Sequence, residues 1–172
     1  MPTPYLHTGI DHFLERLPPR LQGDPDGWEL QFRDDTLAEL PVIGPKGLRL
    51  IAGIYRAIAA FAAAGNHAVV DDVIYDPRVL NAAVEALSDG MVLFVGVRCP
   101  LEVAEERERE RGDRARGGAR VFADAVHRHG VYDLEVDSST LTPDESAAAI
   151  ETALASGRAG DAFARLGELR GR

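Results

Sequence analysis

Two aspartates mark the point where a short apolar segment ends. The run Ala68-Val69-Val70 leads directly into Asp71 and Asp72, and this pattern predicts a buried parallel strand over residues 68–73. Ligands in open α/β sheets bind beyond the carboxyl ends of such strands. Asp71 could hold Mg²⁺ there through water and neutralise phosphate charge. The alternative is that Asp71 or Asp72 caps the following turn, as aspartate often does.

A further aspartate, Asp11, follows Gly9 and a short strand that we predict over residues 5–8. A carboxylate in this place could face a substrate hydroxyl and accept its proton during phosphoryl transfer. Taken alone, Asp11 is more typical of an N-cap for the helical turn predicted over residues 12–17.

Arginines are concentrated between residues 101 and 120. We predict a strongly charged helix over 101–116, on which Arg107, Arg111 and Arg114 share one face because they are spaced i, i+4, i+7. With glycines beyond it, this segment could act as a mobile arginine-rich lid over a transferring phosphoryl group. The interleaved glutamates favour the alternative of a solvated helix with Glu–Arg pairs.

Two large aromatic residues, Trp28 and Phe32, lie within the proline-rich region 18–45. Alternation of apolar and polar residues predicts a hairpin around them. They could wall a pocket for an aromatic ligand, or they could form a small satellite core.

The elements that must position these residues alternate between helix and strand. The spacing of apolar residues predicts helices over 48–64 and 77–88, and buried strands over 91–97 and 133–136. A capping box at Thr142–Glu145 predicts a helix to about residue 155. This order predicts an α/β fold with a parallel sheet. We assign residues 1–156 to one domain, with 101–120 as its lid, and residues 157–172 to a C-terminal tail that is helical over 161–170.

Composition narrows the classes of function. The net charge of -9 argues against a partner with a nucleic-acid backbone. Cys99 is the only cysteine, which excludes an intrachain disulfide and fits a cytoplasmic location. The sequence contains neither a signal peptide nor an apolar run of the roughly 20 residues that a membrane span needs.

Several of these segments, taken in order, resemble the chloramphenicol phosphotransferase family of small P-loop kinases of the nucleotide-kinase type. The similarity covers about residues 4–140. It rests on Gly9-Ile10-Asp11, Val69-Val70-Asp71-Asp72-Val73, Val95-Gly96-Val97-Arg98-Cys99, Arg107-Glu108, Arg111-Gly112-Asp113-Arg114, Val126-His127 and Tyr132-Asp133-Leu134-Glu135-Val136-Asp137.

The resemblance implies ATP-dependent transfer of a γ-phosphoryl group, with Mg²⁺, to a hydroxyl of a small molecule. The family's type member acts on the primary hydroxyl of chloramphenicol, an antibiotic-resistance activity. By this resemblance Asp11 matches the general base, and Asp71 matches the acidic strand end. Arg107, Arg111 and Arg114 belong to the phosphate-binding lid, and Asp137 and Ser138 begin the loop near the adenine.

The chain departs from the family in one respect. It contains no G-x-x-x-x-G-K-[ST] motif, and its single lysine, Lys46, lies in Gly44-Pro45-Lys46-Gly47. In the family, the first strand and the P-loop precede the position of Met1, and that strand is central in the sheet order 2-3-1-4-5. Without it, the strands at 68–73 and 91–97 would be separated or forced to pair directly.

Three hypotheses follow for the function. The first is an O-phosphotransferase whose start codon is assigned too far downstream, so that the 172 residues alone are inactive. The second is a non-catalytic small-molecule-binding or interaction protein of kinase ancestry. The third is a nucleoside or shikimate-type kinase that shares the fold but has another acceptor. The sequence defines no oligomeric state.

Overall fold

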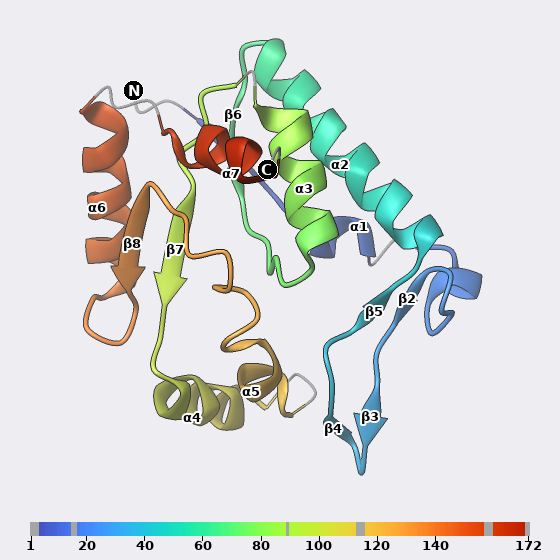
Figure 1. Ribbon diagram of the computed structural model, residues 1–172. Coiled ribbons are helices and arrows are strands. Elements are labelled where there is room, and N and C mark those ends of the chain that lie inside the picture. Colours follow the sequence, from blue (N-terminus) through green and yellow to red (C-terminus); the bar gives the residue numbers. More distant parts are fainter. Residues whose placement is uncertain (1–3, 15–16, 89, 113–115, 157–159, 171–172) are drawn as a thin grey trace. The chain divides into compact units, whose positions relative to one another are not determined.

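The computed structural model describes residues 4–14, 17–88, 90–112, 116–156 and 160–170. The chain forms two compact units (Figure 1). Unit 1 comprises Met1–Gln31 and Glu39–Gly90, and unit 2 comprises Phe32–Ala38 and Met91–Arg172.

Unit 1 contains a parallel pair of strands, β1 (Tyr5–Thr8) and β6 (His67–Val70), with Thr8 opposite Val70. Both strands were predicted, and their parallel pairing agrees with the predicted α/β class. The prediction of a buried strand over 68–73 is wrong in two ways. The strand ends at Val70, and the side chains of Val69 and Val70 are exposed. Side chains of a strand project from the faces of its sheet, so their burial requires elements that cover those faces, and in the described chain β6 belongs to a sheet of only two strands.

Two long helices form the core of unit 1. Helix α2 (Pro45–Ala63) packs against α3 (Pro77–Leu87), each through a stripe of apolar residues at helical spacing. Helix α2 begins three residues before its predicted start, because Pro45 occupies its first turn, where a missing N–H costs nothing. The buried residues of these stripes are Ile51, Ile54, Tyr55, Ile58, Val79, Leu80, Ala83 and Val84.

Shorter elements complete unit 1. They are α1 (Asp11–Leu14), the 3₁₀ turn η1 (Pro19–Leu21), and the antiparallel pair β2 (Trp28–Glu29) and β5 (Val42–Ile43). The predicted hairpin is therefore present, although its strands are only two residues long.

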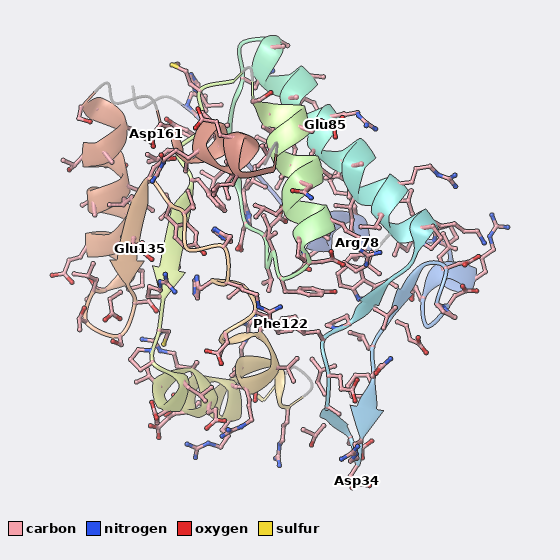
Figure 2. All side chains as sticks on the ribbon, viewed as in Figure 1. Asp34, Arg78, Glu85, Phe122, Glu135 and Asp161 are labelled. Carbon is pink, nitrogen blue, oxygen red and sulfur yellow. The ribbon has the colours of Figure 1, made fainter. Side chains whose placement is uncertain are left out.

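Unit 2 begins with a tight hairpin, β3 (Phe32–Arg33) and β4 (Thr36–Leu37). Asp34 and Asp35 form its two-residue turn with φ of 50° and 61°, the left-handed conformation that such hairpins require. Asp34 lies at the tip (Figure 2).

The second parallel pair, β7 (Val95–Arg98) and β8 (Leu134–Asp137), lies in unit 2. The predicted strand over 91–97 starts four residues late and is not fully buried, since Met91 and Val97 are exposed. The parallel strands of the described chain thus form two separate two-stranded sheets rather than one sheet.

Four helices accompany this second sheet. Helix α4 (Leu101–Arg111) ends at Gly112, whose φ of 63° stops it well short of residue 116, the predicted end. Helix α5 (Gly118–Phe122) was not predicted. Helix α6 (Pro143–Ala155) opens with the predicted capping box, in which both reciprocal hydrogen bonds are present.

The last helix, α7 (Ala162–Arg170), is tied to the rest of unit 2 by the Asp133 carboxylate and by Arg165, whose Nη2 donates to the carbonyl of Tyr132 at 2.8 Å. Asp133 Oδ1 accepts hydrogen bonds from the backbone N–H groups of Asp161 and Ala162, both at 2.8 Å. Its Oδ2 accepts from Phe94 N at 2.7 Å, and the Phe94 ring meets that of Phe163 with centroids 5.1 Å apart.

No helix in the described part of the chain is both long and apolar enough to cross a membrane.

Candidate functional site

Three acidic residues lie together at the carboxyl ends of β1 and β6. Asp11 and Asp71 are predicted site residues, and Asp72 is their neighbour. Parallel pairing continues one step past the strands, where Asp71 N donates to Thr8 O at 2.9 Å. The two segments that follow these strands therefore leave the sheet at the same end, the carboxyl end of both strands. They are Gly9-Ile10-Asp11 and Asp71-Asp72. This is the end at which open α/β sheets bind ligands.

Gly9 makes this close approach possible. A Cβ atom at position 9 would lie 2.1 Å from the carbonyl oxygen of Asp71 and 3.1 Å from Asp72 Oδ1. No other residue fits there without moving backbone, so the glycine is required by the crossing of the two segments.

Asp11 is the first residue of α1, and its side chain is exposed. The expectation that it caps this helix is wrong. The carbonyl of Ile10 accepts the first helical hydrogen bonds, from Phe13 N and Leu14 N at 2.9 Å each, so Ile10 holds the capping position. Within the described chain, no hydrogen bond to the Asp11 carboxylate is present, so that its oxygens can meet a ligand from solvent.

Asp71 presents an exposed carboxylate, whose Oδ2 is 3.9 Å from Nε2 of His7. Oxygen is the donor that Mg²⁺ prefers, and this ion is commonly held by one or two carboxylates together with substrate phosphates. The described residues contain no group of three acidic, histidine or cysteine side chains that could enclose a metal.

Asp72 differs from both of these acids. Its Oδ1 accepts from Ile10 N at 2.5 Å, and its Oδ2 accepts from the Tyr55 hydroxyl at 2.9 Å. Burial raises the pKa of Asp72, the two hydrogen bonds work in the opposite direction, and the charges of Asp71 and Asp11 raise it further. Burial also raises the pKa of Tyr55, so its hydroxyl stays protonated and remains a donor.

Sequence reasoning did not single out this pair. The available signal was a tyrosine on the buried stripe of α2, because a buried tyrosine needs a partner for its hydroxyl.

Trp28 lines an apolar cavity of about 380 Å³ in unit 1. Residues of helix α1 and of helix α2 line this cavity. Phe32 is not among the lining residues: it is exposed, and it lies opposite Leu37 in the β3–β4 hairpin of unit 2. The prediction that both aromatic residues wall one pocket therefore holds for Trp28 alone. The cavity is lined by residues that include Phe13, Leu14, Leu17, Trp28, Leu50 and Ile54.

In unit 2, one of the predicted lid arginines contacts one of the predicted nucleotide residues. Arg107 Nη2 donates to the carbonyl of Ser138 at 2.7 Å, and its Nη1 donates to Ser138 Oγ at 3.1 Å. The neighbouring Asp137 accepts from the backbone and hydroxyl of Ser139 at 2.8 and 2.6 Å, and these bonds lower the pKa of Asp137. Arg107 thereby joins α4 to the loop that follows β8.

Two further arginines of the predicted lid form ion pairs. Arg120 forms an ion pair with Glu105 at 2.5 Å, and Arg109 lies 4.0 Å from Glu106. The pair of Arg109 with Glu106 lies within α4 and agrees with the alternative of a helix with Glu–Arg pairs, whereas the pair of Arg120 with Glu105 joins α5 to α4. Arg111 is the last residue of α4, and Arg114 lies outside the described residues.

These features define an α/β protein with acidic side chains at the carboxyl edge of one parallel strand pair and an arginine–serine contact at the edge of another. The family model described as "Chloramphenicol phosphotransferase-like protein" matches residues 1–155. The chain belongs to this family, as its resemblance predicted.

Two curated relatives come from Mycobacterium tuberculosis. They are "Putative O-phosphotransferase MT2714" of strain CDC 1551 / Oshkosh and "Putative O-phosphotransferase Rv2636" of strain ATCC 25618 / H37Rv. Each is 35% identical over 146 residues, which is 81% of this chain and 64% of the relative. The chain thus spans a little under two thirds of their length. Membership of the family implies a P-loop kinase fold.

Proposed function

We propose that this protein takes part in ATP-dependent transfer of a γ-phosphoryl group to a hydroxyl of a small molecule. The observation that carries the proposal is the parallel pairing of β1 and β6, which delivers Asp11 and Asp71 to one sheet edge in a member of this family. Two exposed carboxylates at the carboxyl ends of parallel strands suit the two roles of base and metal ligand.

Asp11 is proposed as the general base. Its carboxylate is exposed and accepts no hydrogen bond from the other described residues, so it can accept the proton of an acceptor hydroxyl. Asp71 is proposed to hold Mg²⁺ together with phosphate oxygens. The ion supplies neutralisation of the phosphate charge when it is bound.

The acceptor is proposed to bind in the apolar cavity beside Trp28. A volume of about 380 Å³ lies at the small end of the range for ligand sites and suits a molecule with one ring. Asp11 and Leu14 are three residues apart on α1 and so share a face, and Leu14 lines the cavity. This supports an acceptor whose apolar body enters the cavity while its hydroxyl meets Asp11.

The nucleotide is proposed to lie against the loop of Asp137 and Ser138, with Arg107 holding that loop and Arg111 and Arg114 in the lid. The 172 residues supply no P-loop, and Lys46 is engaged with Asp26 at 2.8 Å. A second candidate is a small-molecule-binding protein of kinase ancestry that binds no ATP, and the apolar cavity beside Trp28 favours it.

One set of measurements separates the two candidates. The longest in-frame product of the gene is purified, and transfer of labelled γ-phosphate is assayed with chloramphenicol and with a panel of hydroxylated metabolites. Transfer that depends on ATP and Mg²⁺ supports the enzyme, and the panel identifies its acceptor. Absence of nucleotide heat in calorimetry, together with binding of an apolar small molecule, supports the binding protein instead.

A further inference from the structure

We propose that Asp72 is a positioning residue: it holds the Ile10 amide, and Tyr55 in turn holds the Asp72 carboxylate, so that Asp11 is presented in one place. The proposal rests on the proposed role of Asp11 as a base. It assigns a function to a Tyr55–Asp72–Ile10 chain of hydrogen bonds, which we call the clamp.

The clamp uses both oxygens of one carboxylate. Asp72 Oδ1 accepts a hydrogen bond from the backbone N–H of Ile10 at 2.5 Å, and Ile10 directly precedes Asp11. Asp72 Oδ2 accepts from the Tyr55 hydroxyl at 2.9 Å. Tyr55 is 1% exposed in the middle of α2, so its hydroxyl is a fixed anchor. A carboxylate bonded through both oxygens cannot rotate, and charge-assisted bonds of this kind are about twice as strong as neutral ones.

Further contacts restrain the backbone that leads into Asp11. Ile10 is buried, and its carbonyl accepts from Phe13 and Leu14. Gly9 is in contact with the carbonyl of Asp71. The backbone that leads into Asp11 is therefore rigid, whereas its side chain faces solvent. This combination is what a proton acceptor needs, because displacement of a catalytic group by about 1 Å can cost about 100-fold in rate.

Asp72 itself is unsuited to be the base. Both of its oxygens already accept hydrogen bonds from within the protein, and its partners lie in the interior. Its contact with Ile10, the residue directly before Asp11, is the route by which it can act on the base.

The first test measures the clamp without any assay of activity. In a proton–nitrogen NMR spectrum of the gene's in-frame product, the Ile10 amide proton should resonate far downfield, because it donates to a carboxylate. Asp72→Asn should move it upfield while keeping the shape of the side chain, and Tyr55→Phe should move it less. Glu85→Gln, an exposed acid on α3 (Figure 2), is the matched control and should leave it in place. An Ile10 amide that does not respond to Asp72→Asn overturns the clamp.

The second test separates positioning from structural support by a double-mutant cycle. Asp72→Ala should lower kcat by roughly 10- to 100-fold, the usual effect of losing a supporting contact. In the Asp11→Asn background it should have no further effect, because Asp72 acts through Asp11. An equal loss in both backgrounds overturns the positioning role. If the protein transfers no phosphate at all, the proposed function fails, and the amide shift still decides whether the clamp exists.

Discussion

Three aspartates at one sheet edge differ in what they can do, because their surroundings differ. Asp11 and Asp71 are exposed, whereas Asp72 is half-buried and bonded through both oxygens. The environment of a carboxyl group, rather than its residue type, sets its role. A mechanism for this protein must therefore treat the three acids separately.

The base assignment makes a prediction for a single residue. Asp11→Asn should lower kcat by roughly 10²–10⁴-fold, as expected for the loss of a general base, and should leave the affinity for ATP nearly unchanged. Asp35→Asn is the matched control, because asparagine tolerates the left-handed conformation of the hairpin turn as well as aspartate does. Steady-state kinetics with the acceptor found in the panel would check both variants. An unchanged kcat in Asp11→Asn removes this residue from the mechanism.

At the scale of the elements, the two glycines of helix α2 differ in how much space surrounds them. A Cβ at Gly47 would lie 2.3 Å from the carbonyl of Gly27, whereas a Cβ at Gly53 would meet nothing within 4 Å. Both residues line the apolar cavity. Gly47 is therefore required by packing, and Gly53 leaves space at the cavity.

This difference predicts opposite effects of the same substitution. Gly53→Ala should raise the free energy of unfolding by roughly 0.5–1 kcal/mol, because glycine inside a helix is destabilising. Gly47→Ala should lower the free energy of unfolding.

Gly53→Leu should raise the KM for the acceptor without loss of stability, because the larger side chain enters the cavity. Thermal unfolding and acceptor kinetics check these outcomes. A stable Gly53→Leu variant with unchanged KM would show that the acceptor binds elsewhere.

The start of α3 makes a prediction about pH. Asp76 caps this helix by accepting from Arg78 N at 2.8 Å, and it also pairs with the Arg78 guanidinium at 2.6 Å. Burial opposes ionisation of Asp76, but these hydrogen bonds outweigh it and hold its pKa below the usual value of 3.8. A lowered folded pKa means that the stabilisation is complete above the unfolded pKa and is lost as pH falls through the folded value.

Asp76→Ala should therefore cost about 1 kcal/mol at neutral pH, the usual value of a helix cap. The difference from the unchanged protein should shrink below about pH 4, near the ordinary aspartate pKa. Asp76→Asn keeps the cap and loses the ion pair, so its stability should depend less on pH in this range. Urea unfolding at pH 3 to 7 measures these differences. Parallel stability curves for Asp76→Ala and the unchanged protein would contradict the prediction.

Structural features that depend on a few neighbouring residues were predicted correctly from the sequence. Features that depend on residues distant in the sequence were not. The capping box at Thr142 was predicted from sequence because it involves atoms within three residues. The burial of the strand at 68–73 was predicted wrongly, since burial depends on which elements cover the faces of its sheet. The Asp72–Tyr55 bond joins residues 17 apart, and no local pattern marks it.

At the scale of the whole molecule, the two parallel pairs each keep an unpaired apolar edge. Strand β6 pairs with β1 and β7 pairs with β8, and no further strand of the described chain joins either pair. Val69 and Val97 are 52% and 55% exposed. An open apolar edge presents unpaired N–H and C=O groups and invites pairing with another chain.

The 172-residue polypeptide should therefore associate as its concentration rises, through these strand edges. A charged side chain on an edge strand blocks such pairing, so Val69→Lys and Val97→Lys should each shift the population toward monomer, and the double variant should do so further. Leu169→Lys removes an equally exposed apolar side chain from helix α7 and should change little. Sedimentation velocity over a range of concentrations distinguishes these outcomes. A polypeptide that stays monomeric throughout, or one that only Leu169→Lys makes monomeric, would place the association surface away from the strands.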